Sequence, residues 1–114
     1  MEKNIFGEPL RICCKNPITG YFRDGLCRTE IGDTGTHTVC AVMTEDFLKF
    51  SASKGNDLIT PMPYYQFPGL KVGDKWCLCV TRWTQAEKAG KAPKLILEAT
   101  HEKTLEYASL NLLV

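Results

Sequence analysis

Turn-forming residues interrupt two long stretches of this chain, residues 7–36 and 56–71, and this limits the fold more than any other feature. Proline lacks a backbone donor and glycine accepts a positive φ, so regular elements rarely continue through such residues. Ordered loops of this length are uncommon in compact domains and are often functional. The interrupting residues are Asn16-Pro17, Thr19-Gly20, Asp24-Gly25 and 32–35 in the first stretch, and Pro61, Pro63 and Pro68 in the second.

The segments between these stretches predict few regular elements. An apolar, β-branched run predicts a buried strand at 38–43, and Thr44 followed by two acidic residues predicts a capped helix at 45–54. We also expect strands at 20–23, 75–83 and 95–100, a helix at 84–89 begun by a capping box, a turn with a short strand at 101–108, and a brief helix at 109–114.

This order of elements predicts the fold class. Few strands with helices between them favour an α+β fold, a small two-layer sandwich with one mainly antiparallel sheet, helices on one face and two long ordered loops. With 114 residues the chain is predicted to be a single domain, 1–114, and its expected folded surface is about 6,300 Å².

Charge and composition exclude several classes of protein. Lys and Arg number 14 and Asp and Glu 13, so the net charge of +1 argues against a strongly basic nucleic-acid binder. A hydrophobic content of 44% is typical of a globular chain, and no apolar run is long enough to cross a membrane. We therefore expect neither nucleic acid nor membrane as a partner, and the oligomeric state is left open.

The N-terminal residues and the cysteines bear on the compartment. No apolar signal region follows Met1, so a cytoplasmic location is expected, where the six cysteines would stay reduced. On a strand, Cys77 and Cys79 share one face, and Cys40 on the neighbouring strand could meet either. We interpret these strand cysteines as small buried apolar residues.

A second group of sulfur and imidazole side chains is a candidate site. Cys13, Cys14 and Cys27 lie in the first turn-rich stretch, with His37 and Cys40 close by in sequence. Three interpretations stay open: structural thiols, a reactive thiol activated by nearby cations, or a metal site. No cofactor is expected, although zinc is possible, because His37 and Cys40 have chelate spacing while paired Cys-x-x-Cys motifs are missing.

Polar residues at expected strand ends and loop starts form another candidate site. Such positions often carry binding or acid–base chemistry, but turn formation, ion pairing and helix capping explain each residue better, and we favour these structural roles. The residues are Arg23, Asp24, Asn56, Asp57, Arg82, His101 and Glu102. The chain lacks a phosphate-binding glycine loop, a Gly-x-Ser-x-Gly motif and a His-Glu-x-x-His motif.

Five blocks of the sequence stand out: CCKNPITGYFRDG at 13–25, HTVCAVMT at 37–44, GNDL at 55–58, FPGLKVGDKWCLC at 67–79 and ATHE at 99–102. Together they resemble the small bacterial family catalogued as domain of unknown function 2237. Asn16 stands where an acidic residue is common before the proline, and Val72 where a proline is common. The resemblance spans about residues 4–113 and implies a compact α+β fold in one domain, but no activity or site residue.

Two functional hypotheses follow from the sequence. In the first, residues 7–36 and 56–71 form a cleft that binds a small molecule or a protein partner. In the alternative, the cysteines and His37 make a metal-binding or thiol-reactive enzyme or sensor. Whether the protein is an enzyme is left undecided.

Overall fold

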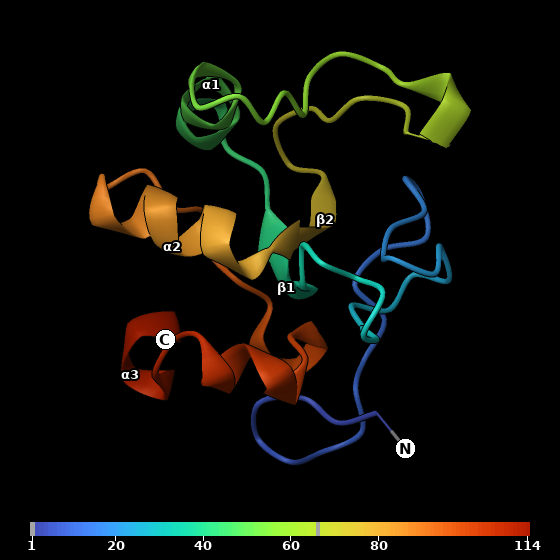
Figure 1. Cartoon of the computed structure of the whole chain (residues 1–114), viewed down its shortest axis with the longest axis vertical. Coiled ribbons are helices and arrows are strands. Elements are labelled where there is room, and N and C mark those ends of the chain that lie inside the picture. Colours follow the sequence, from blue (N-terminus) through green and yellow to red (C-terminus); the bar gives the residue numbers. More distant parts are fainter. Residues whose placement is uncertain (1, 66) are drawn as a thin grey trace.

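The computed structural model describes residues 2–65 and 67–114 (Figure 1). Its accessible surface is 6510 Å², close to the area expected from chain length. Within the described residues, no helix combines the length and apolar character needed to cross a membrane. The elements are β1 His37–Val42, α1 Glu45–Ser53, η1 Pro63–Tyr65, β2 Lys75–Cys79, α2 Val80–Lys88, η2 Leu97–Ala99, η3 Glu102–Glu106 and α3 Leu110–Leu113.

The sheet has two antiparallel strands, β1 and β2, and an irregular segment follows the other edge of β1. Cys40 lies opposite Cys77 in the β1–β2 register. On the other edge, the Ile96 N–H donates to the Cys40 carbonyl over 2.8 Å and the His101 N–H donates to the Thr38 carbonyl over 2.9 Å. The α+β prediction is confirmed, but the regular strand expected at 95–100 is wrong, because η2 interrupts that segment.

Helix α2 begins four residues earlier than predicted. The strand expected to reach Trp83 ends at Cys79, and the chain turns into a helix at Val80. Val80, Trp83 and Ala86 are buried at three-residue spacing, which is the helical period. The bulky aromatic and β-branched residues here favour a strand locally, but burial of this helical face overrides that preference.

Helix α1 follows the sequence prediction closely. The Thr44 side chain accepts from the Phe47 N–H over 3.1 Å, and the helix runs over Glu45–Ser53. Gly55 follows the helix with a φ of +87°. Capping chemistry is local, so this element could be predicted without knowledge of its tertiary contacts.

Two further predicted strands are wrong, and the predicted C-terminal helix is confirmed. Residues 20–23 form turns, so the strand expected there is wrong. The short strand within 101–108 is also wrong, since η3 occupies that segment, whereas the brief C-terminal helix is confirmed as α3.

The two faces of the sheet bury different kinds of side chain. One face packs into the main apolar core with α1 and α2, through residues such as Val39, Ala41 and Leu78. The other face carries Cys40 and Cys77 and packs against the first turn-rich segment. Figure 1 shows this segment on the side of the sheet away from α2 and α3. The segment 7–36 therefore takes the place of a second layer of regular structure.

Both irregular segments contain one glycine that no other residue could replace without movement of the backbone. A Cβ on Gly20, at φ +99°, would lie 2.3 Å from the Leu26 carbonyl oxygen. A Cβ on Gly69, at φ +81°, would lie 2.4 Å from the Ile59 carbonyl oxygen. Each glycine thus permits a close chain reversal that closes its loop.

Candidate functional site

Four of the six cysteines form two disulfides, so the expectation that all six stay reduced is wrong. Cys13 bonds to Cys40, with Cα atoms 5.6 Å apart, and Cys27 bonds to Cys77, with Cα atoms 5.2 Å apart. The predicted burial of Cys40 and Cys77 is confirmed. Each disulfide ties the first irregular segment to one strand of the sheet.

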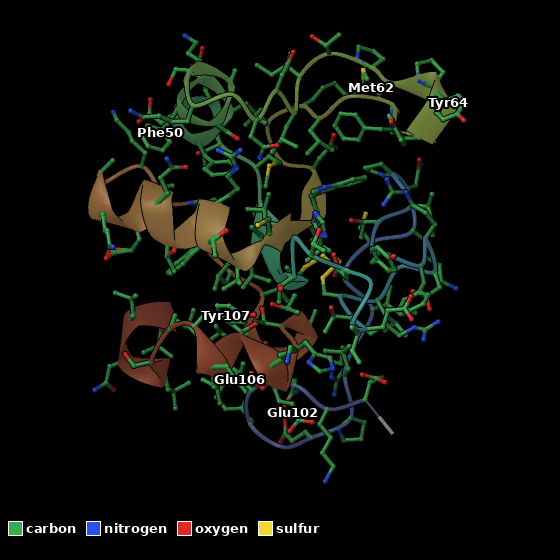
Figure 2. The ribbon with its side chains drawn as sticks, viewed as in Figure 1. Phe50, Met62, Tyr64, Glu102, Glu106 and Tyr107 are labelled. Atoms are coloured by element: carbon green, nitrogen blue, oxygen red, sulfur yellow. A yellow bond between two sulfur atoms is a disulfide. The ribbon has the colours of Figure 1, made fainter. Side chains whose placement is uncertain are left out.

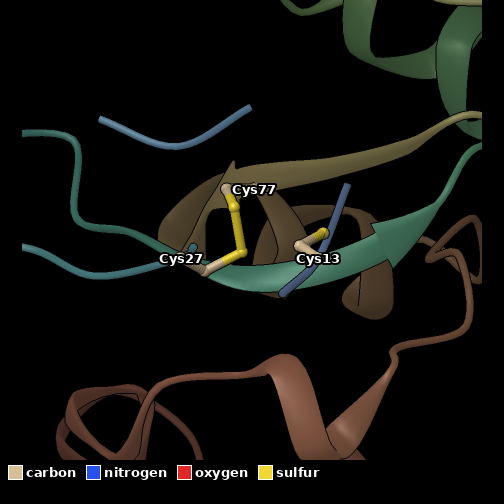
Figure 3. A group of neighbouring side chains, drawn as sticks. All are labelled: Cys13, Cys27 and Cys77. Carbon is tan, nitrogen blue, oxygen red and sulfur yellow. A yellow bond between two sulfur atoms is a disulfide. The ribbon is translucent and has the colours of Figure 1, made fainter. Parts of the chain in front are cut away.

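The two disulfides lie next to each other. The Sγ atoms of Cys13, Cys27 and Cys77 all lie within 4.8 Å of one another (Figure 3). Together with Cys40 we call these residues the sulfur cluster. The structure therefore brings together three of the five predicted thiol or metal residues, Cys13, Cys27 and Cys40, and adds Cys77, which was interpreted only as a core residue.

The remaining candidates, Cys14 and His37, are not members of this cluster, and the prediction that Cys79 is buried is wrong. Cys14 and Cys79 are free and half-buried, and the Cys79 Sγ lies 3.1 Å from the Thr81 hydroxyl. His37 forms a 2.6 Å contact through Nδ1 with the Asp33 carboxylate.

A cavity of about 580 Å³ separates the two irregular segments, and we call it the loop cleft. The Arg23 guanidinium donates to the Tyr65 carbonyl over 3.2 Å, so the segments meet at its edge. Figure 2 places Tyr64 on the outer end of the second segment. The lining residues are Gly20, Tyr21, Phe22, Arg23, His37, Tyr64, Tyr65, Trp76 and Cys77.

Arg23 is the cation of the loop cleft. Its guanidinium donates to the Gly20 carbonyl over 2.7 Å and stacks on the Trp76 ring, 5.1 Å from the ring centroid. Its Nε atom is buried, and among the described residues neither a hydrogen-bond partner of Nε nor a carboxylate that pairs with the guanidinium is found. Desolvation by burial lowers the pKa of Arg23, although the guanidinium stays charged. Its φ of +55° is unusual for a residue with a side chain.

His37 is held in place by a buried carboxylate. The Asp33 side chain is 1% exposed and accepts from the His37 N–H over 2.9 Å and from the Thr29 hydroxyl over 2.9 Å. Burial raises the pKa of Asp33, but the hydrogen bonds from His37 and Thr29 outweigh it and hold that pKa below its ordinary value. The ionised carboxylate favours the hydrogen on Nδ1 of His37, so Nε2 is the ring nitrogen left without this partner.

Aromatic rings form most of the wall of the loop cleft. Tyr21 and Phe22 make an edge-to-face pair with centroids 5.2 Å apart, and Tyr64 and Tyr65 make another at 5.2 Å. Sequence reasoning singled out Tyr64 and Tyr65 as loop aromatics but missed Tyr21, Phe22 and Trp76 as cleft residues. Trp76 could not be found from sequence, because a tryptophan in a strand is more often part of the core.

The predicted polar residues of the first segment and of α2 make separate local contacts. Asp24 pairs with Arg28 at 2.7 Å. Burial raises the pKa of Asp24, but hydrogen bonds from Arg28 and the Leu26 N–H outweigh burial and hold that pKa below its ordinary value. Arg82 donates to the Lys54 carbonyl over 3.0 Å, away from the loop cleft.

The polar candidates at turns and caps have structural partners. Asp57 closes a turn by accepting from the Ile59 and Thr60 N–H groups at 2.8 and 3.1 Å, and Asn56 follows α1. His101 is buried and caps η3, accepting from the Lys103 N–H over 3.0 Å. Its Nε2 lies 2.6 Å from the Glu2 carboxylate, whereas Glu102, labelled in Figure 2, is exposed. Of the predicted polar residues, only Arg23 lines the loop cleft.

Comparison with known proteins places the chain in a family. No curated protein matches the chain. The model of one protein family matches residues 3–114, nearly the whole sequence, and its description is "Uncharacterized protein conserved in bacteria (DUF2237)". The chain belongs to this family, which the five sequence blocks had already indicated.

Proposed function

We propose that the protein binds a small molecule that carries an anionic group and a flat apolar part, and that it does so in the loop cleft. The observation that carries this proposal is the environment of Arg23. Its guanidinium is partly desolvated, lines the cleft and donates to two backbone carbonyls, but no carboxylate of the described residues pairs with it. A desolvated cation without a counter-charge is costly, and an anionic ligand in the cleft would relieve that cost.

The size and lining of the loop cleft support a small ligand. Its volume of about 580 Å³ falls within the usual range for small-molecule sites, about 300–1,000 Å³. Five aromatic side chains line it, and such rings offer flat apolar surfaces for stacking. A mostly apolar cavity with a few polar groups is the usual composition of a ligand site.

The charges of the loop cleft favour an anion over a cation. Aromatic faces also attract cations, but the Arg23 guanidinium already lies over Trp76 and would repel a second positive charge. The carboxylate of Asp33 is fully occupied by His37 and Thr29, so no free negative group faces the cavity among its described lining residues. His37 adds a second polar group that can contact the ligand.

Phenyl phosphate, benzoate and benzylamine test this proposal as simple probes of matched size. We expect the two anions to quench Trp76 fluorescence in a Trp83→Phe background, and benzylamine to have no effect at the same concentrations. Arg23→Gln should weaken binding of phenyl phosphate about 10- to 100-fold, since a hydrogen bond to a charged group contributes about 1.5–3 kcal/mol.

Arg82→Gln is the matched control, because Arg82 also donates to a backbone carbonyl but lies outside the cleft. It should leave the affinity unchanged within about twofold, the usual scatter of surface changes. Preferential binding of benzylamine, equal losses in the two variants, or no binding of either anion would each refute the proposal.

A further inference from the structure

The sulfur cluster contains four potential thiolate ligands in a small volume. Three sulfurs, those of Cys13, Cys27 and Cys77, lie within 4.8 Å of one another, and the Cys40 sulfur is bonded to that of Cys13 at 2.07 Å. Figure 3 shows the Cys27–Cys77 bond beside Cys13. Sulfurs around one tetrahedral zinc ion are about 3.8 Å apart, from Zn–S bonds of about 2.3 Å. The bonded pairs would therefore separate by only about 1.7 Å to reach that spacing.

The backbone holds all four residues in place from separate segments. Cys40 and Cys77 are direct neighbours across β1 and β2, so their side chains project from the same face of the sheet. Cys13 and Cys27 come from the segment that covers this face. Because the ligands are dispersed along the chain, no Cys-x-x-Cys spacing reveals them. The sequence pointed to Cys13, Cys27 and Cys40, but to His37 and Cys14 in place of Cys77.

The cluster is closed to solvent, which is typical of structural zinc sites rather than catalytic ones. Cys27 and Cys40 are 0% exposed, Cys77 is 1% exposed and Cys13 is 5% exposed. Ala99 and Ile96 complete the packing around the sulfurs. No open coordination position for water is therefore expected.

We propose that, when both disulfides are reduced, Cys13, Cys27, Cys40 and Cys77 bind one zinc ion as a tetrathiolate site. Each disulfide accepts two electrons and two protons from a cellular dithiol, which becomes a disulfide in turn. Zinc then displaces the four thiol protons and binds four thiolates. The zinc itself undergoes no redox change.

Zinc would replace the disulfides in the same structural role. In the oxidised protein, the two disulfides tie residues 7–36 to both strands. Disulfides persist in oxidising compartments, and a reducing one, such as the predicted cytoplasm, would remove them. A four-ligand ion would join the same segment to the same strands and so retain the wall of the loop cleft.

Titration of the reduced full chain with Co²⁺ and Zn²⁺ tests this site. The chain is reduced in the absence of oxygen with a phosphine, because a phosphine adds no thiols that could bind the metal. The phosphine takes up one water oxygen per disulfide and becomes a phosphine oxide, leaving two thiols. We expect one Co²⁺ per chain with the visible absorption of a tetrahedral thiolate complex, and its displacement by one Zn²⁺. The oxidised chain should take up neither ion at this site.

Variants of single cysteines identify the ligands. Cys13→Ser, Cys27→Ser, Cys40→Ser and Cys77→Ser should each weaken Zn²⁺ binding more than about 100-fold, since loss of an outer-shell partner alone costs 10–100-fold. Cys14→Ser and Cys79→Ser are the matched controls and should bind as the wild type does. These controls keep the test decisive even if a cluster variant fails to fold.

Three results would overturn the zinc proposal. They are failure of the reduced wild-type chain to take up stoichiometric metal, equal uptake by the oxidised chain, and loss of binding in Cys14→Ser or Cys79→Ser. None of them depends on the ligand of the loop cleft, so the zinc site and the proposed function succeed or fail separately.

Discussion

The two irregular segments form opposite walls of the loop cleft but are stabilised in different ways. The first, 7–36, is bonded to β1 and β2 by two disulfides, and its Thr19 hydroxyl accepts from the Cys77 N–H over 2.8 Å. The second, 56–71, closes on itself through the Leu70 N–H and Leu58 carbonyl at 2.8 Å. The wall with the cationic group is thus fixed covalently, whereas the aromatic wall with Tyr64 relies on local hydrogen bonds and packing.

The difference between the walls also explains what each contributes. A guanidinium that binds an anion must be placed accurately, and Arg23 sits next to the covalently fixed part of the chain. Stacking on an aromatic ring tolerates small shifts of the ring. We therefore expect changes in the first segment to alter stability strongly, and comparable changes at the tip of the second to alter it little.

Removal of the disulfides in the first segment should have the largest effect. In the oxidised, metal-free protein, Cys27→Ala/Cys77→Ala should lower the free energy of unfolding by about 4 kcal/mol, from chain entropy for a sequence separation of 50. Cys13→Ala/Cys40→Ala should cost slightly less, about 3.5 kcal/mol, because its separation is 27. Urea denaturation measures both. A reversed order, or losses below about 1 kcal/mol, would show that the disulfides do not anchor this wall.

Substitution of one aspartate in each wall should give smaller losses of stability than removal of a disulfide. Both aspartates have a lowered pKa. Asp33 is buried in the first segment and Asp57 is exposed in the second. The hydrogen bonds of Asp57 to the Thr60 hydroxyl and to the Ile59 and Thr60 N–H groups lower its pKa. Asp33→Asn should cost about 1–2 kcal/mol at pH 7, because a charged acceptor of several hydrogen bonds is lost. Asp57→Asn should change stability less.

The pH dependence of the Asp33 effect has a definite sign. A carboxyl whose pKa is lower in the folded state contributes stability above its unfolded pKa, and this contribution disappears as pH falls through the folded value. The gap between wild type and Asp33→Asn should therefore be constant near neutral pH and narrow below about pH 4. Urea denaturation at several pH values measures the gap. A gap that widens on acidification would contradict the assignment of an ionised Asp33.

The smallest effect on stability is expected at the tip of the second segment. Tyr64 is 91% exposed, so Tyr64→Ala should change the free energy of unfolding by less than about 0.5 kcal/mol. The same variant should weaken phenyl phosphate binding several-fold if the Tyr64 ring stacks on the ligand, because such stacking contributes about 0.5–1.5 kcal/mol. Calorimetric titration beside urea denaturation separates the two effects. A large loss of stability would show that this wall is anchored more firmly than its contacts indicate.

Local chemistry made part of this structure predictable. Thr44 and its acidic neighbours specify α1, and the β-branched run at 38–43 specifies β1. The end of β2 was not predictable, because Val80 and Trp83 fit a strand locally and adopt a helix through burial. Tertiary packing decides such segments.

The candidate site was predictable only in outline. Turn residues located the two segments that enclose the loop cleft, and Arg23 and His37 were among the candidates. The disulfide pairing was not accessible, because six cysteines permit many combinations. Asp57 and His101 have polar side chains like those of a site, but Asp57 accepts from turn N–H groups, and His101 accepts from a cap N–H and contacts the Glu2 carboxylate.

The most direct test of anion binding in the loop cleft follows the Arg23 Nε–H resonance in ¹H–¹⁵N spectra during titration of the oxidised wild type with phenyl phosphate. Arg23 lines the cleft and its Nε–H has no partner among the described residues, so an anion bound to the guanidinium should shift this resonance in a saturable manner, together with the amides of residues 20–23. The Arg82 resonance should stay in place. An unmoved Arg23 resonance, or equal shifts of both arginines, would contradict the assignment of the loop cleft as an anion-binding site.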